Sequence, residues 1–310
     1  MRKAILHLGL HKTGTTFLQL TMRRWFAENP GACEDIFYSS QHAKSSQWLG
    51  FRSKTYLHMR DRIAFRHNSR RQIDEASLTE MLDKLSLLDK FRDFQGHFAK
   101  PQNIFLHSDE NTLGATFGHL AAGGRLKWPF YPNGDWLAAT VALAASTYYE
   151  SVEIILSVRT FDEMILSSLK DAVLQEHRID SLQEFRDLLS NIGAQFEHIV
   201  DSLRQFGAIE KIHILDFDIL KRSQNEYFAA FLSLLGEFKV GAGASRAINA
   251  SPDEDRIVAL LIDKKLVGPD RGTSSLRDIV GCDFLSRAKL EYGRTIDHLR
   301  TLGPKVLYYS

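Results

Sequence analysis

Short, nearly continuous apolar runs recur along the chain, separated by longer segments in which apolar residues return every three or four positions. Such runs predict buried strands, and such spacing predicts helices with one buried face. The predicted strands are 4–9, 103–108, 152–158 and 211–215. The predicted helices are 15–26, 75–94, 135–150, one beginning near 162, several within 181–206, 225–236, and several within 253–302.

The alternation of these strands and helices predicts a parallel sheet with helices on both faces, an α/β fold of three layers. In the C-terminal part, at about 250–302, Phe284, Ala288, Tyr292 and Ile296 share one helix face. The sequence shows no internal repeat and no interdomain linker. We therefore expect a single domain over residues 1–310.

The composition is that of an ordinary globular protein, with 44% hydrophobic and 25% charged residues. A net charge of +1 gives no argument for a nucleic-acid or membrane partner. The two cysteines, Cys33 and Cys282, cannot make a disulfide framework, which favours a reducing compartment. The longest uncharged apolar stretch, 136–147, is too short to span a bilayer. We expect a cytoplasmic protein without a transmembrane segment.

The segment HLGLHKTGTTFLQ joins the first predicted strand to the first predicted helix. Gly9 and Gly14 have the spacing of a phosphate-binding P-loop, but Thr15 stands where that loop has its lysine, and Lys12 precedes the second glycine. Backbone N–H groups and the helix dipole favour a phosphate at such a turn. Hydroxyl groups of threonines at 13, 15 and 16 and the charge of Lys12 add donors.

This loop resembles the 5′-phosphosulfate loop of sulfotransferases that use 3′-phosphoadenosine 5′-phosphosulfate (PAPS), most closely bacterial, carbohydrate-sulfotransferase-like members with a K-T-G-T-T loop. The resemblance touches residues 4–20, 103–111, 152–175 and 211–236. It implies a P-loop NTPase-like three-layer fold, PAPS as donor, 3′-phosphoadenosine 5′-phosphate (PAP) as product, and no required metal. The donor-binding residues it implies in the loop are His11, Lys12, Thr13, Gly14, Thr15 and Thr16.

A second element of the family binds the 3′-phosphate through an arginine after a strand and a serine eight positions later. Arg159 and Ser167 have this spacing, and Ser168 is an alternative donor. An arginine at the carboxyl end of a parallel strand lies where such sheets bind ligands, and its planar fork suits a phosphate.

Sulfuryl transfer needs a base for the acceptor hydroxyl and a positive charge at the leaving oxygen. The resemblance assigns the base to the Ser-x-Glu turn after the second predicted strand, which makes Glu110 the first choice. His107 is an alternative, because some relatives use a histidine in this region. His11 and His7 are spare candidates, although His7 is also interpreted as a core histidine. Lys12 would neutralise the leaving oxygen.

Residues 40–72 hold eight Lys/Arg and one acidic residue, Asp61. This basic insert could form a lid that meets an anionic glycan, with Trp48, Phe51 and Tyr56 stacking on sugar rings. The alternative is a solvated helical hairpin or a disordered loop.

Two other functions remain open on sequence grounds. One is a small-molecule kinase or NTPase of the same architecture, which the missing Gly-Lys-Ser/Thr disfavours. The other is a catalytically silent nucleotide-binding protein of the same fold.

Overall fold

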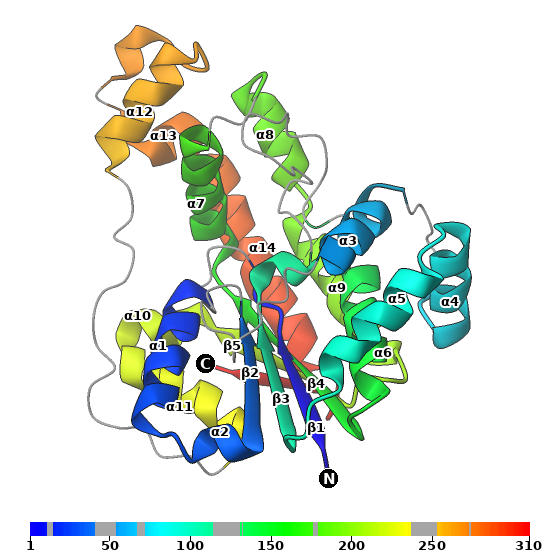
Figure 1. Ribbon diagram of the computed structural model, residues 1–310. Helices are drawn as coiled ribbons and strands as arrows, with labels where there is room; N and C mark the ends of the chain where they lie inside the picture. The colour runs from blue at the N-terminus through cyan, green and yellow to red at the C-terminus, as the bar shows by residue number, and fades with distance from the viewer. Residues whose placement is uncertain are drawn as a thin grey trace.

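In the part of the chain that the structure describes, six parallel strands form one sheet in the order β2-β3-β1-β4-β5-β6 (Figure 1). Their bounds are β1 Lys3–His7, β2 Ile36–Ser40, β3 Ile104–Ser108, β4 Ser151–Val158, β5 Lys211–Asp216 and β6 Val306–Tyr309. The strand that precedes the glycine-containing loop, β1, is therefore interior, between β3 and β4. The predicted α/β fold with a parallel sheet and helices on both faces is confirmed.

The computed structural model describes residues 1–10, 15–40, 54–66, 72–113, 131, 133–175, 179–236, 253–272 and 274–310. The side chains at positions 15, 16, 54, 55, 65, 66, 110 and 111 lie outside this description. Every helix among the described residues is too short or too polar to cross a membrane.

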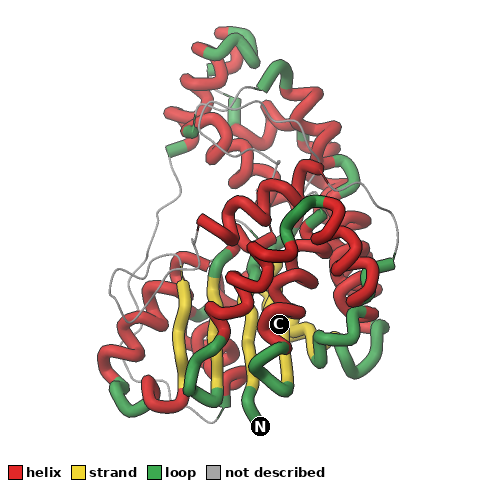
Figure 2. The backbone as a smooth tube through the Cα atoms, turned by 45° about the vertical axis from the view of Figure 1, so that its right-hand side comes forward, coloured by secondary structure: helices red, strands yellow, loops and turns green. Residues whose placement is uncertain are grey.

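Two helical layers enclose the sheet (Figures 1 and 2). One face carries α1 Thr15–Glu28, α2 Ala32–Asp35, α10 Phe217–Arg222 and α11 Gln224–Leu235. The other face and its upper end carry α3 Lys54–Arg66, α4 Glu75–Lys84, α5 Leu88–Gln95, α6 Gly134–Ser146, α7 Phe161–Leu174, α8 Leu182–Leu189, α9 Ile192–Gln205, α12 Glu254–Asp263, α13 Leu276–Val280 and α14 Cys282–Arg300. Short 3₁₀ turns among the described residues are η1 Gly96–Phe98, η2 Glu110–Leu113 and η3 Pro269–Arg271.

The two hydrophobic cores follow from the alternation of side chains along each strand. On β1, Ala4 and Leu6 enter the core beneath α6, whereas Ile5 enters the core beneath α1 and α11. On β3, Phe105 enters the core beneath α6, and Leu106 enters the core beneath α1 and α11. Both faces of the interior strands are buried, which is why their sequences are nearly continuous apolar runs.

The four predicted strands are confirmed, but the two edge strands, β2 and β6, were not predicted. The single helix expected over 75–94 is wrong, because the chain forms α4 and α5 with a break between them. At that break Ser86 adopts a left-handed backbone (φ 55°), and its N–H bonds to the Asp83 carbonyl oxygen. The 3.6-residue spacing continues through the break, so the pattern gives no signal of it. The single-domain interpretation stays a prediction.

Within the described residues, the C-terminal part of the chain contains helices α12, α13 and α14. On α14, Ala288, Tyr292 and Ile296 are buried together, and Phe284 packs against the same core. The chain then leaves α14 and adds β6 beside β5.

Candidate functional site

The carboxyl ends of β1, β3, β4 and β5 lie side by side at one edge of the sheet. His7 pairs with Ser108 and Ile155 across β1, and Val158 pairs with Asp216 between β4 and β5. Ligands of open α/β sheets bind outside this edge. The segments that follow these four strands therefore carry the candidate site.

The segment after β1 continues along β4 as far as Leu10. The Leu8 N–H donates to the Ile155 carbonyl oxygen at 2.9 Å, and the Leu10 N–H donates to the Ser157 carbonyl oxygen at 3.2 Å. Helix α1 then begins at Thr15, as the sequence predicts. His11, Lys12, Thr13 and Gly14 lie outside the described residues, so their proposed roles stay predictions.

Helix α1 is fastened to the end of β3 through a buried glutamine. The Gln19 side-chain amide donates to the Ser108 carbonyl oxygen at 3.0 Å, and Gln19 is 1% exposed. Phe17 and Leu18 pack in the core on the same face of the sheet. The first turn of α1 and the turn after β3 are therefore held next to one another.

A buried polar chain joins the strands beneath this edge. His7 Nδ1 lies 2.8 Å from Ser108 Oγ, and His7 Nε2 lies 2.9 Å from Ser157 Oγ. The Tyr227 hydroxyl of α11 donates to Ser157 Oγ at 3.0 Å. Burial lowers the pKa of His7 to about 3, so the ring is neutral and links β1, β3 and β4. The interpretation of His7 as a core histidine is confirmed, and its spare role as a base is disfavoured.

His107 is also fully buried, on the opposite face of the sheet. Its Nε2 lies 2.9 Å from Thr112 Oγ1, and burial lowers its pKa to about 3, with His7 adding to the effect. A base that meets a reacting hydroxyl must be accessible and must accept a proton near neutral pH. This placement disfavours His107 as the catalytic base.

Glu110 opens the 3₁₀ turn η2 that directly follows β3. The Asp109 N–H donates to the His7 carbonyl oxygen at 3.1 Å, which holds this turn against the end of β1. Asp109 itself is buried, at 3% exposure. Glu110 thus belongs to the turn that lies against the end of β1, and its role as base stays a prediction because its side chain is not described.

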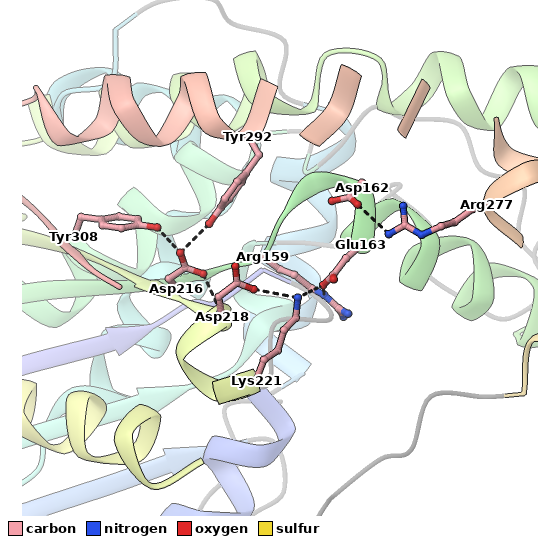
Figure 3. Close-up of polar contacts among 9 residues, drawn as sticks. All are labelled: Arg159, Asp162, Glu163, Asp216, Asp218, Lys221, Arg277, Tyr292 and Tyr308. Carbon is pink, nitrogen blue, oxygen red and sulfur yellow. Dashed lines mark hydrogen bonds and ion pairs between the residues drawn. The ribbon is translucent and has the colours of Figure 1, made fainter. Parts of the chain in front are cut away.

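Arg159 follows β4 and lies over an aromatic ring that follows β5. Its guanidinium carbon is 4.9 Å from the centre of the Phe217 ring, and its Nε–H donates to Glu163 Oε2 at 2.9 Å (Figure 3). The Arg159 side chain is 22% exposed. Stacking and the hydrogen bond orient the guanidinium at the edge of the sheet.

Ser167 lies four residues after Glu163 on α7, and therefore on the same helix face. Ser167 is half-buried, whereas Ser168 is buried at 5% exposure. Since Glu163 contacts Arg159, this face favours Ser167 over Ser168 as a partner of Arg159. Their joint binding of a phosphate stays a prediction.

Two charged side chains at this edge were not singled out from the sequence. Glu163 Oε2 forms ion pairs with both Arg159 and Lys221, and Lys221 Nζ also lies 3.0 Å from Asp218 Oδ1 (Figure 3). The spacing of four residues between Arg159 and Glu163 was the available signal. The contact with Lys221, on α10, depends on the sheet order.

Behind this group, Asp216 anchors the end of β5. Its Oδ1 accepts the Asp218 N–H at 2.8 Å, and its Oδ2 accepts hydroxyl groups of Tyr292 and Tyr308 (Figure 3). The carboxylate caps α10 and ties α14 and β6 to the start of that helix. The position of Lys221 is thereby fixed by three other elements.

The basic insert contains helix α3, which packs into the core instead of standing in solvent. Tyr56 is 3% exposed, stacks on Phe94 and donates its hydroxyl to the Thr112 carbonyl oxygen at 2.7 Å. The prediction that Tyr56 stacks on a sugar is wrong, because its ring belongs to the core. Trp48 and Phe51 lie outside the described residues.

Among the described residues, no group of three or more His, Cys, Asp or Glu side chains is arranged to hold a metal ion. An open groove of about 450 Å³ lies between α8 and the start of α14, with Arg186, Phe284 and Arg287 in its lining. The described lining of this groove contains neither Arg159, Ser167 nor His107.

Comparison with known proteins gives little beyond this geometry. No protein-family model matches the chain, and no curated protein matches it. Among solved structures, the chain is similar to a crystal structure of a sulfotransferase from Alicyclobacillus acidocaldarius, with 12% sequence identity and a TM-score of 0.40. The similarity covers 88% of this chain and 99% of that chain. A likeness this distant assigns neither a family nor an activity.

Proposed function

We propose that this chain is a PAPS-dependent sulfotransferase that transfers a sulfuryl group to an acceptor hydroxyl by in-line displacement. One observation carries the proposal: the K-T-G-T-T loop joins an interior strand of a parallel sheet to a helix N-terminus, and Arg159 leaves the neighbouring strand at the same edge. A loop in this position suits a nucleotide phosphate.

The proposed roles divide between the two ends of the donor. The 5′-phosphosulfate is bound by the loop. The residues of the loop that contact it are His11, Lys12, Thr13, Gly14, Thr15 and Thr16. Arg159 and Ser167 bind the 3′-phosphate. Glu110 takes the proton of the acceptor hydroxyl, whose oxygen attacks sulfur opposite the bridging oxygen. The bond from sulfur to that bridging oxygen breaks, its electron pair stays on the 5′-phosphate of PAP, and Lys12 neutralises the new charge.

The acceptor we propose is a carbohydrate that carries an anionic group. Basic side chains of the insert 40–72 would bind this group. With Tyr56 in the core, the proposal of a sugar contact from this insert depends on its other residues. An acceptor screen that finds only neutral, hydrophobic alcohols would contradict the carbohydrate part and leave the sulfuryl transfer intact.

The first experiment is a thermal-shift titration with PAP, compared with ATP in the presence of Mg²⁺. A ligand at about 100 times its Kd adds about 2.7 kcal/mol to the free energy of unfolding, which is easily detected. We expect stabilisation by PAP and little by ATP with Mg²⁺. The reverse result would favour a kinase or NTPase.

The second experiment measures sulfuryl transfer from PAPS to a panel of sugars and alcohols. Binding of PAP without transfer to any acceptor would support the silent nucleotide-binding alternative. Failure to bind PAP would reject the proposed function.

A further inference from the structure

Two cations share a single carboxylate oxygen where β4 and β5 end. Arg159 Nε and Lys221 Nζ both contact Oε2 of Glu163, so the two positive groups lie close together and share this oxygen as an ion-pair partner (Figure 3). Arg159 follows β4, and Lys221 lies on α10, which begins directly after β5. The parallel register of these strands pairs Val158 with Asp216 and so brings the two segments together.

The three charged side chains are partly exposed and are anchored to buried residues on one side. The Phe217 ring lies under the Arg159 guanidinium, and Asp216 caps α10 and accepts two tyrosine hydroxyls behind it. The side chains of Arg159, Glu163 and Lys221 are 22%, 28% and 37% exposed. An anion can therefore approach both cations without displacing the core.

Glu163 and Lys221 are both charged at neutral pH. Burial acts to raise the pKa of Glu163, but Lys221 and Arg159 outweigh it and hold that pKa below its usual value. Burial acts to lower the pKa of Lys221, but Glu163 and Asp218 outweigh it and raise that pKa. Glu163 thus serves as a permanent counter-ion that holds the two cations at a short separation.

We infer that Lys221 is a second cation for the 3′-phosphate of the nucleotide, and that Glu163 positions Lys221 beside Arg159. This inference rests on the proposed function, in which Arg159 binds that phosphate. A phosphate dianion offers three acceptor oxygens, so one oxygen can accept from the guanidinium and another from the ammonium group. Two cations in the segments that follow neighbouring strands would also distinguish a nucleotide with a 3′-phosphate from one without it.

The test compares PAP with adenosine 5′-monophosphate, which lacks the 3′-phosphate, by calorimetric titration of the full chain. A hydrogen bond to a charged group is worth enough to change affinity about 10- to 100-fold. We expect Lys221→Met to weaken PAP binding by about this factor and to change binding of adenosine 5′-monophosphate less than about twofold. Lys221→Gln, which keeps a hydrogen-bond donor without the charge, provides a second variant in case Lys221→Met folds poorly.

Two controls separate this role from a structural one. Arg277→Met removes a cation from the same region, where Arg277 pairs with Asp162 on α7 (Figure 3). Asp218→Asn removes one partner of Lys221 and leaves the cation in place. Both controls should keep the wild-type preference for PAP. If Lys221 only fastens α10, Lys221→Met should weaken the two nucleotides equally and lower the thermal stability.

The outcomes are distinct. If the wild type prefers PAP and the Lys221 variants keep that preference, the inference is overturned and the proposed function stands. If the wild type does not bind PAP, the proposed function fails and this inference fails with it. Loss of the preference in the Lys221 variants alone supports the inference.

Discussion

His7 and His107 lie on the neighbouring strands β1 and β3, face opposite sides of the sheet, and are both fully buried. His7 is hydrogen-bonded to the hydroxyl groups of Ser108 and Ser157, and His107 is hydrogen-bonded to the hydroxyl group of Thr112. Burial lowers both pKa values to about 3. The folded sheet therefore holds two neutral histidines that the unfolded chain would protonate below pH 6.5.

The first prediction is a loss of stability in acid. Above about pH 6.5 both histidines are neutral in the folded and unfolded states, so they make no pH-dependent difference. Between about pH 6.5 and 3 only the unfolded chain binds their protons, so the free energy of unfolding falls by up to about 1.4 kcal/mol per pH unit for each histidine. Urea unfolding at pH 7, 6, 5 and 4 measures this slope.

Histidine variants test whether His7 and His107 cause the change of the free energy of unfolding with pH. We expect His107→Gln to reduce the slope by about half of the histidine contribution, or about 1.4 kcal/mol per pH unit. His58 is exposed on α3, so His58→Gln should leave the slope unchanged. Parallel slopes for the wild type and His107→Gln would show that His107 is not held neutral.

The second prediction concerns Lys12 as the group that neutralises the leaving oxygen. Removing one electrostatic donor to a developing charge typically costs about 100- to 1,000-fold in kcat, so Lys12→Ala should lose sulfuryl transfer on this scale. Steady-state transfer from PAPS to the best acceptor measures it. Lys84→Ala, on the exposed surface of α4, removes the same charge and should keep the wild-type rate. Near-normal turnover in Lys12→Ala would reject this role.

The third prediction concerns Glu110 as the base. Glu110→Gln should lower kcat by about 100- to 10,000-fold, because general-base catalysis contributes on this scale, and should leave PAP binding unchanged. The rate and the calorimetric affinity are measured on the same preparation. Retained turnover with normal PAP binding would transfer the assignment to His11, since His107 is buried and neutral.

The fourth prediction tests the correction at Tyr56. Tyr56→Phe keeps the ring stacked on Phe94 but removes the hydrogen bond to the Thr112 carbonyl oxygen, so it should cost about 1 kcal/mol of stability. The KM for the acceptor should not change. A raised acceptor KM with unchanged stability would restore Tyr56 to the acceptor site.

The four strands that the sequence predicts are those with nearly continuous apolar runs, because they lie between other strands and are buried on both faces. The edge strands β2 (IFYSS) and β6 (VLYY) are short and mix apolar with polar or tyrosine side chains, so their pattern does not differ from that of a loop. Pairing with β3 and β5 makes them strands, and pairing is a property of the assembled sheet.

The residues of the candidate site also fall into two groups, those that local sequence predicts and those that depend on how the strands pair. Strand β1, helix α1 and the position of Arg159 after β4 could be predicted because each is local in sequence. Lys221 could not, because its contact with Glu163 requires β5 to lie beside β4. Tyr56 was misassigned because an aromatic residue in a basic segment has the same appearance whether it faces a ligand or the core.

The interior position of β1 has a consequence for how the chain folds. Lys3 pairs with Ile104 on one side and with Ser151 on the other, so the first strand cannot be completed until distant parts of the chain have formed. Such long-range pairing raises the contact order and slows folding. An N-terminal fragment would hold the loop sequence without either neighbour of its strand. The nucleotide binding that the proposed function requires should therefore appear late in refolding, together with the closing of the sheet around β1.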